Sequence, residues 1–103
     1  SDEELADIKE INPGYARYNI KAGTYKGQDE EVGTLGTNTV IYVSPSMDPA
    51  LVEKILEVID RHLSDLQTLH PLMKGFTLEK AVKDLGAPLH PGAEAFYKKK
   101  GIL

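Results

Sequence analysis

The chain has 103 residues, of which 41% are hydrophobic and 27% are charged, and its formal net charge is −4 at pH 7. This length fits one domain with a modest core, and the acidic balance argues against nucleic acid or an anionic membrane as main partner, because both need a basic surface. The absence of cysteine excludes disulfides and thiolate chemistry, and no apolar run approaches the roughly 20 residues of a membrane-spanning helix.

An acidic segment opens the chain. Leu5 and Ile8 fall at helical spacing within residues 1–12, which predicts a short helix or a tail there. The sequence Asn12-Pro13-Gly14 ends this segment, because proline lacks a backbone donor and glycine tolerates the left-handed conformation.

A strand, a glycine-containing loop and a second strand are predicted for residues 16–43. The first strand is indicated by an alternation of apolar and polar residues that starts at Tyr18. The firmest part of the second strand is residues 39–43, Thr-Val-Ile-Tyr-Val, where β-branched and aromatic side chains follow one another without interruption. Such a run is typical of a buried strand, so we expect residues 39–43 to be covered on both faces.

Helices are predicted for most of the remaining chain. A long helix covers residues 48–70, with Asp48 as its N-cap and Pro49 in its first turn. Apolar residues recur along this helix at steps of three and four, which predicts a broad and well-buried stripe. The stripe is formed by Val52, Ile55, Leu56, Ile59, Leu63 and Leu66, and it is widened by Leu51, Val58 and Leu69. Two short helices are predicted within residues 77–100, the first capped by Thr77.

The loop between the two strands holds the most distinctive candidate site. Gly23 and Gly27 allow a backbone with positive φ. Thr24, Tyr25 and Gln28 offer hydroxyl and amide groups to a small polar solute. The structural alternative is that the glycines form a tight connection and that Tyr25 packs against the fold. The residues alone leave both interpretations open.

No other segment indicates catalysis or metal binding. His62, His70 and His90 have no partner at metal-ligand spacing, so we expect each to be structural. The acidic run 29–31 is expected to be solvated, and the lysines at 98–100 are expected to complement a helix dipole. Because no nucleophile stands beside a base in a recognised motif, the sequence predicts neither an enzyme nor a cofactor.

Two blocks of the sequence resemble a known family. They are Ala22-Gly23-Thr24-Tyr25-Lys26-Gly27-Gln28-Asp29-Glu30 and Pro88-Leu89-His90-Pro91-Gly92-Ala93. At this spacing they are similar to the C-terminal third of TAXI-type solute-binding subunits of tripartite ATP-independent periplasmic (TRAP) transporters. The resemblance covers residues from about 13 to 103. Lys21 and Lys26 stand where the family usually has proline, which marks a divergent member.

This resemblance implies an α/β chain that forms the C-terminal part of a periplasmic-binding-protein-like (type II) fold. Two main strands, one long helix and two or three short helices are then expected. It further implies a periplasmic receptor that captures a small organic solute, an amino acid or a carboxylate, for TRAP membrane permease subunits, without catalysis. Residues 20–28 would lie at the hinge or cleft, with Gly23 and Gly27 at the hinge and the three polar loop residues on the solute. We expect the chain to be too short to complete the two-lobed site in one copy.

The alternative interpretation is an independent small α/β interaction module. A two-stranded sheet leaves open edges, and open edges favour homodimerisation or domain swapping. Such a module would bind another copy of itself rather than nucleic acid, and it too would have no catalytic activity.

Overall fold

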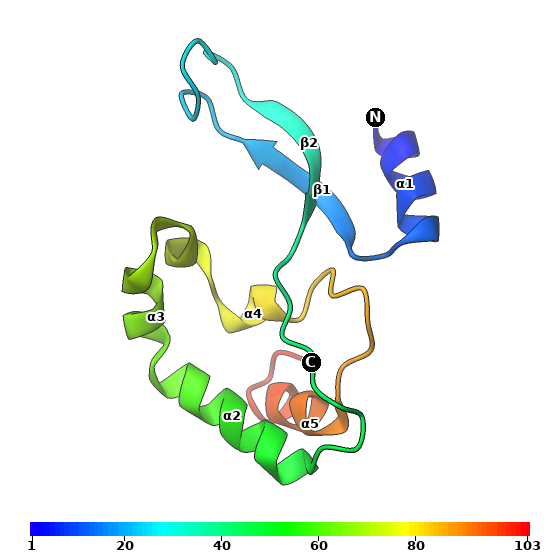
Figure 1. Cartoon of the computed structure of the whole chain (residues 1–103), viewed down its shortest axis with the longest axis vertical. Helices are drawn as coiled ribbons and strands as arrows, with labels where there is room; N and C mark the ends of the chain where they lie inside the picture. Colours follow the sequence, from blue (N-terminus) through cyan, green and yellow to red (C-terminus); the bar gives the residue numbers. More distant parts are fainter. The chain divides into compact units, whose positions relative to one another are not determined.

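The computed structural model describes all 103 residues. It contains two antiparallel strands, five α-helices and one short 3-10 helix (Figure 1). Residues 1–40 with 84–87 form one compact unit, and residues 41–83 with 88–103 form a second. The predicted α/β fold class is confirmed, since this arrangement is consistent with part of a binding-protein fold. None of the helices has the length and apolar character needed to cross a membrane.

Helix α1 (Asp2–Ile11) lies where the sequence predicts a short helix or a tail. Ser1 caps it, because the Glu4 backbone N–H donates to Ser1 Oγ (3.2 Å) and the Glu4 carboxylate accepts from the Ser1 amine (2.6 Å). This reciprocal arrangement is a capping box, which satisfies donors that a helix start leaves unpaired. After the helix, the Asn12 side chain accepts from the Gly14 N–H (2.9 Å) and turns the chain toward the sheet.

Strands β1 (Tyr15–Ile20) and β2 (Val32–Thr37) form an antiparallel hairpin. Its register pairs Tyr15 with Thr37 and Ile20 with Val32. Tyr18 lies over Gly36 so closely that a Cβ added to this glycine would be only 2.8 Å from Tyr18 Cβ. Glycine at this position therefore lets the two strands approach under the tyrosine.

The prediction of a strand at residues 39–43 is wrong. Strand β2 ends at Thr37, and the chain from 39 to 43 continues as an irregular run without a sheet partner. Ile41 and Tyr42 are 77% and 70% exposed rather than buried. A strand covered on both faces needs neighbouring strands and packed layers, and the sheet consists only of β1 and β2, which pair with each other.

The predicted long helix is divided in two. Helix α2 (Pro49–Arg61) and helix α3 (Leu63–Leu69) meet at His62, whose φ of −106° and ψ of 19° depart from helical values. Asp48 caps α2 by accepting the Ala50 N–H (2.8 Å). The helix is thus interrupted at His62, about two turns before the predicted end at residue 70, while the predicted start is retained.

Two histidine–proline pairs shape the rest of the second unit. His70 precedes the 3-10 helix η1 (Pro71–Gly75), and His90 precedes helix α5 (Pro91–Lys99). In each pair the imidazole Nδ1 accepts the backbone N–H two residues further on, at 3.1 Å. Both histidines are therefore N-caps, followed by a proline whose missing N–H costs the helix nothing.

The core of the second unit lies where α5 packs on α2, beside the short helix α4 (Leu78–Ala81). The Phe96 and Tyr97 rings meet edge to face, with centroids 5.3 Å apart and planes at 76°. Gly92 brings the two helices together, because a Cβ there would be 2.3 Å from the Pro49 carbonyl oxygen. The buried core residues are Val52, Leu78, Ala93, Phe96 and Tyr97.

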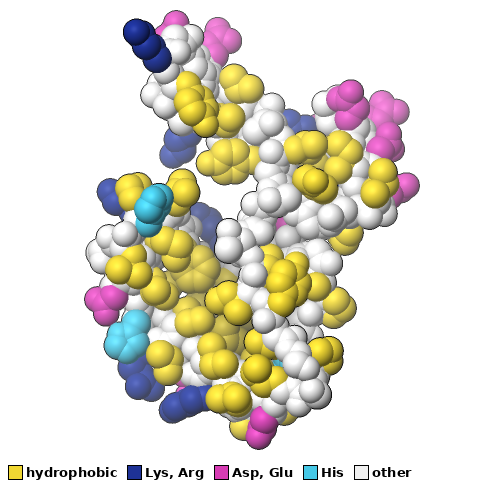
Figure 2. Space-filling model, in the orientation of Figure 1, with side chains coloured by type: hydrophobic (Ala, Val, Ile, Leu, Met, Phe, Trp, Pro, Cys, Tyr) yellow, Lys and Arg dark blue, Asp and Glu magenta, His cyan; other side chains and the backbone are white.

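The apolar stripe of α2 is only partly covered. Val52 is 5% exposed, whereas Leu51, Ile55 and Val58 are 51%, 39% and 43% exposed. These three lie about 60–120° around the helix from Val52, at 3.6 residues per turn. Helix α5 covers the Val52 side, and hydrophobic side chains remain visible over the second unit in Figure 2. The prediction of a single well-buried stripe is therefore wrong for Leu51, Ile55 and Val58, and also for Leu69 of α3, which is 74% exposed.

Candidate functional site

The loop that joins β1 to β2 closes on itself through its backbone, at the tip of the hairpin (Figure 1). The Gly23 N–H donates to the Gln28 carbonyl oxygen (2.7 Å), and the Gln28 N–H donates to the Tyr25 carbonyl oxygen (3.2 Å). Gly23 and Gly27 have φ values of 76° and 81°. A Cβ at either position would meet nothing within 4 Å. The left-handed backbone, rather than a lack of space, is thus what requires glycine.

Gln28 organises this loop from within. Its Nε2 donates to the carbonyl oxygens of Ile20 (3.2 Å), Lys21 (3.2 Å) and Glu30 (3.0 Å), and its Oε1 accepts from the Tyr25 N–H (3.3 Å). A side-chain amide has two N–H donors and one oxygen, so the loop itself uses both donors and one acceptor site. A solute that accepts a hydrogen bond from Gln28 must first displace one of these backbone carbonyls.

Thr24 and Tyr25 are more available than Gln28. The Thr24 hydroxyl donates to the Lys21 carbonyl oxygen (2.6 Å) and keeps its own lone pairs as acceptors. Tyr25 is 66% exposed, so it does not pack against the fold as the structural alternative requires. Its hydroxyl takes no part in the hydrogen bonds that hold the loop. All three predicted contact residues therefore share one ordered loop, but only two of them present polar atoms outward.

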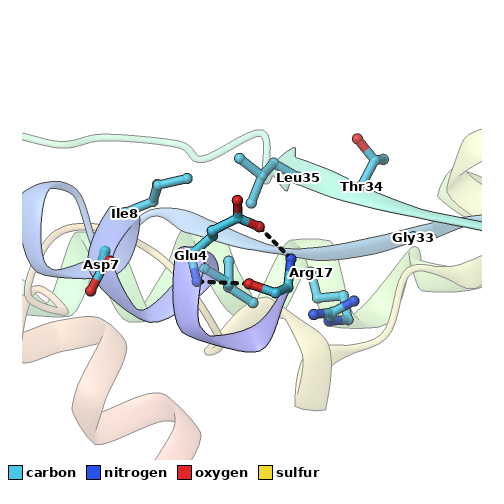
Figure 3. A pocket seen from close by; sticks show the side chains of 9 residues that line it. Glu4, Asp7, Ile8, Arg17, Gly33, Thr34 and Leu35 are labelled. Carbon is cyan, nitrogen blue, oxygen red and sulfur yellow. Dashed lines mark hydrogen bonds and ion pairs between the residues drawn. The ribbon is translucent and has the colours of Figure 1, made fainter.

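A separate groove of about 520 Å³ lies in the first unit, between α1 and the hairpin (Figure 3). Leu5, Ile8 and Leu35 give it apolar walls, and Arg17 and Thr34 line its strand side. None of the predicted loop residues lines this groove. The structure thus offers two distinct surfaces in the first unit, the loop and the groove.

Two of the charged side chains that line the groove, Arg17 and Glu4, are held in ion pairs. Arg17 pairs with Asp2, and Glu4 accepts from the Ser1 amine at 2.6 Å. The hydrogen bond from this amine is the main cause that holds the pKa of the Glu4 carboxyl below its usual value. Sequence reasoning missed the groove because only the tertiary packing of α1 beside the hairpin forms it, and no local pattern records that packing.

The structure gathers no metal-binding set. No three His, Cys, Asp or Glu side chains lie close enough together to hold a metal ion. His62 Nδ1 lies 3.3 Å from Asp65 Oδ2 on the same side of the helical segment. His70 and His90 use Nδ1 as helix caps, which are structural roles.

A comparison with known protein families finds a match that covers nearly the whole chain. The model of the NMT1-like family matches residues 1–101 of the chain. The matched range includes the loop, the groove and all but the last two residues of the two compact units. It therefore concerns the fold as a whole rather than a single short motif.

Proposed function

The chain belongs to the NMT1-like family, a family of solute-binding proteins of the periplasmic type, and we propose that it forms part of an extracytoplasmic receptor for a TRAP-type secondary transporter. The family match over residues 1–101 is the observation that carries solute binding. The assignment to a TRAP transporter is supported by the two TAXI-like sequence blocks around Gly23 and His90. In this proposal the receptor works in the periplasm, has no catalytic activity and delivers its solute to membrane permease subunits.

The loop is the proposed contact region for the solute. The exposed Tyr25 hydroxyl donates to a carboxylate oxygen of the solute, and the free lone pairs of Thr24 Oγ1 accept from an ammonium group. An amino acid carries both groups, and a carboxylate carries the first. Gln28 contributes as a positioning residue, because its side chain holds the turn between Gly23 and Gly27. The two glycines are the proposed hinge.

One loop is too small to enclose a solute. Small-molecule sites usually bury about 70–90% of the ligand surface, whereas Thr24 and Tyr25 both lie on an exposed hairpin tip. We therefore propose that this chain supplies one side of a two-lobed site and that, by itself, it binds solute weakly.

NMR titration of the chain with amino acids and dicarboxylic acids tests this function. We expect shifts of the loop amides with a Kd of about 1 mM or weaker. Tyr25→Phe removes only the hydroxyl and is expected to reduce these shifts. Tyr18→Phe, which alters another exposed tyrosine of the same unit, is the matched control. Micromolar binding by the chain alone would contradict the one-sided site, and shifts confined to other segments would contradict the loop contact.

A further inference from the structure

The groove beside α1 lies entirely within the first unit, between one side of the helix and the hairpin (Figure 3). Residues that pair across an antiparallel sheet point to the same face, and the register pairs Arg17 with Leu35. Leu5 and Ile8 are three residues apart on α1, so they share one side of the helix. The groove therefore combines an apolar surface from two elements with a single guanidinium group.

Arg17 is positioned from two sides. On the strand side, Gly33 makes room for it, because a Cβ added to this glycine would be 3.2 Å from a guanidinium nitrogen of Arg17. On the helix side, the Asp2 carboxylate pairs with the guanidinium, and the Asp2 side chain is 94% exposed. Ion pairs that are exposed to solvent contribute little to stability. Another carboxylate can therefore displace Asp2 from Arg17 with little loss of stability.

We propose that this groove binds a small monocarboxylate with an apolar tail. The carboxylate takes the place of Asp2 on Arg17, whose planar guanidinium can donate two parallel hydrogen bonds to it. The tail packs on Leu5, Ile8 and Leu35, which removes apolar surface from water. Leu35 is 42% exposed and has surface left to bury. The groove volume of about 520 Å³ lies within the range of small-molecule sites, about 300–1,000 Å³.

The other charges of the groove narrow the class of ligand. Glu4 and Asp7 line its helix side. Glu4 is paired with the Ser1 amine at 2.6 Å, and Asp7 is exposed to solvent, where salt screens its charge. A second carboxylate on the ligand would still meet these acidic groups, so the groove favours a monocarboxylate over a dicarboxylate. The proposal is independent of the solute contact proposed for the loop.

NMR titration of the chain with hexanoate tests this site. Acetate, which lacks the tail, and hexanol, which lacks the carboxylate, are the matched ligand controls. We expect hexanoate to shift the amides of residues 5–8 and 33–35 with a Kd of about 1–10 mM at about 0.15 M salt. The amides of the loop residues 23–28 should not shift. Both control ligands are expected to bind at least about tenfold more weakly.

Substitutions of the ion pair separate the proposed site from unspecific apolar binding. Arg17→Gln is expected to weaken hexanoate binding about tenfold or more, because the carboxylate loses its partner. Asp2→Asn removes the internal competitor and is expected to tighten binding about two- to fivefold. Glu3→Gln is the control, since it removes the same charge from the same helix turn but does not line the groove. A gain of affinity in Asp2→Asn cannot arise from unfolding, whereas a loss in Arg17→Gln could, so the Tm of both variants is measured.

Tyr25→Phe keeps this test apart from the test of the loop. It is expected to leave hexanoate binding unchanged, whatever it does to the solute contact at the hairpin tip. Three outcomes overturn the proposal: hexanoate binding no tighter than that of acetate or hexanol, full binding by a folded Arg17→Gln variant, or an Asp2→Asn variant that binds no more tightly than Glu3→Gln.

Discussion

Replacing Gly92 with alanine probes the contact on which the second unit is built. Gly92 is buried in the first turn of α5, against the first turn of α2. An added Cβ would be 2.3 Å from the Pro49 carbonyl oxygen, 3.0 Å from the Pro49 carbonyl carbon and 2.9 Å from Val52 Cβ. None of these atoms can rotate away, because two belong to the backbone and the third is attached to it. We expect Gly92→Ala to move the helices apart.

Two opposing effects set the size of the change. Helix propensity favours alanine over glycine by up to about 1 kcal/mol. Overpacking of a close contact costs about 1–3 kcal/mol, and a separation of 2.3 Å is far inside the roughly 3.5–4.0 Å at which such atoms attract. Overpacking therefore prevails, and we expect a net loss of about 1–2 kcal/mol. For a domain of this size, that loss lowers Tm by roughly 4–16 °C.

Thermal unfolding followed by far-UV circular dichroism measures this loss. Gly75→Ala is the matched control, because a Cβ there would meet only the flexible Lys80 Nζ, at 3.7 Å. We expect the control to stay within about 0.5 kcal/mol of the parent. A Gly92→Ala variant with an unchanged or higher Tm would falsify the close approach of α2 and α5.

Three further predictions concern the core, the loop and alkaline pH. Phe96→Ala is expected to cost about 3–5 kcal/mol in urea unfolding, because the ring is buried in the core. By contrast, Lys99→Ala should leave the free energy of unfolding almost unchanged, since the lysine of its ion pair with Glu53 is exposed. An equal loss of unfolding free energy in the Phe96 and Lys99 variants would contradict the assignment of Phe96 to the core. Gln28→Leu should speed hydrogen exchange of the hairpin-loop amides without affecting α2 or α5, and unaltered loop protection would refute the organising role of the amide. Burial raises the pKa of the Tyr97 phenol above its usual 10.0, so the folded state holds this proton more tightly than the unfolded chain. That contribution is complete below pH 10 and is lost as pH rises through the raised pKa, so Tyr97→Phe should flatten the alkaline fall in Tm.

The starts of α2 and α4 could be predicted from the sequence, because helix caps involve residues that are close together in the chain. Asp48 and Pro49 mark the start of α2, and the Asp48 carboxylate accepts the Ala50 N–H. Thr77 likewise accepts the Lys80 N–H (3.3 Å) at the start of α4. Caps of this kind are local, because donor and acceptor lie two or three residues apart. A local sequence pattern is therefore sufficient to locate them.

The burial of apolar side chains was predicted less well than the helix caps. Ile41 and Tyr42 in the run 39–43, and the Leu51, Ile55 and Val58 face of α2, are as apolar as core segments, yet they are exposed. An apolar pattern states what a segment tends to bury, and whether burial occurs depends on a partner surface. The groove beside Arg17 has the same origin, since it exists only where α1 meets the hairpin.

Residue types were enough to identify the candidate loop, but they did not predict the hydrogen bonds within it. Gln28 has the same donors and acceptors whether it faces a solute or the backbone. Only the structure shows that three carbonyl oxygens and the Tyr25 N–H already engage it. The sequence inventory therefore identifies the polar groups of the loop, and folding decides which of them face outward.

The two histidine–proline caps determine which ring nitrogen carries the proton when the imidazole is neutral. Because Nδ1 of both His70 and His90 accepts a backbone N–H, the neutral ring must carry its proton on Nε2. In His90 that nitrogen is buried and has no hydrogen-bond partner in the chain. The ring nitrogens are thus two built-in spectroscopic reporters, one at the start of η1 and one at the start of α5. As each cap melts, the preference for one tautomer disappears at that ring, so nitrogen chemical shifts can follow the two helix starts separately.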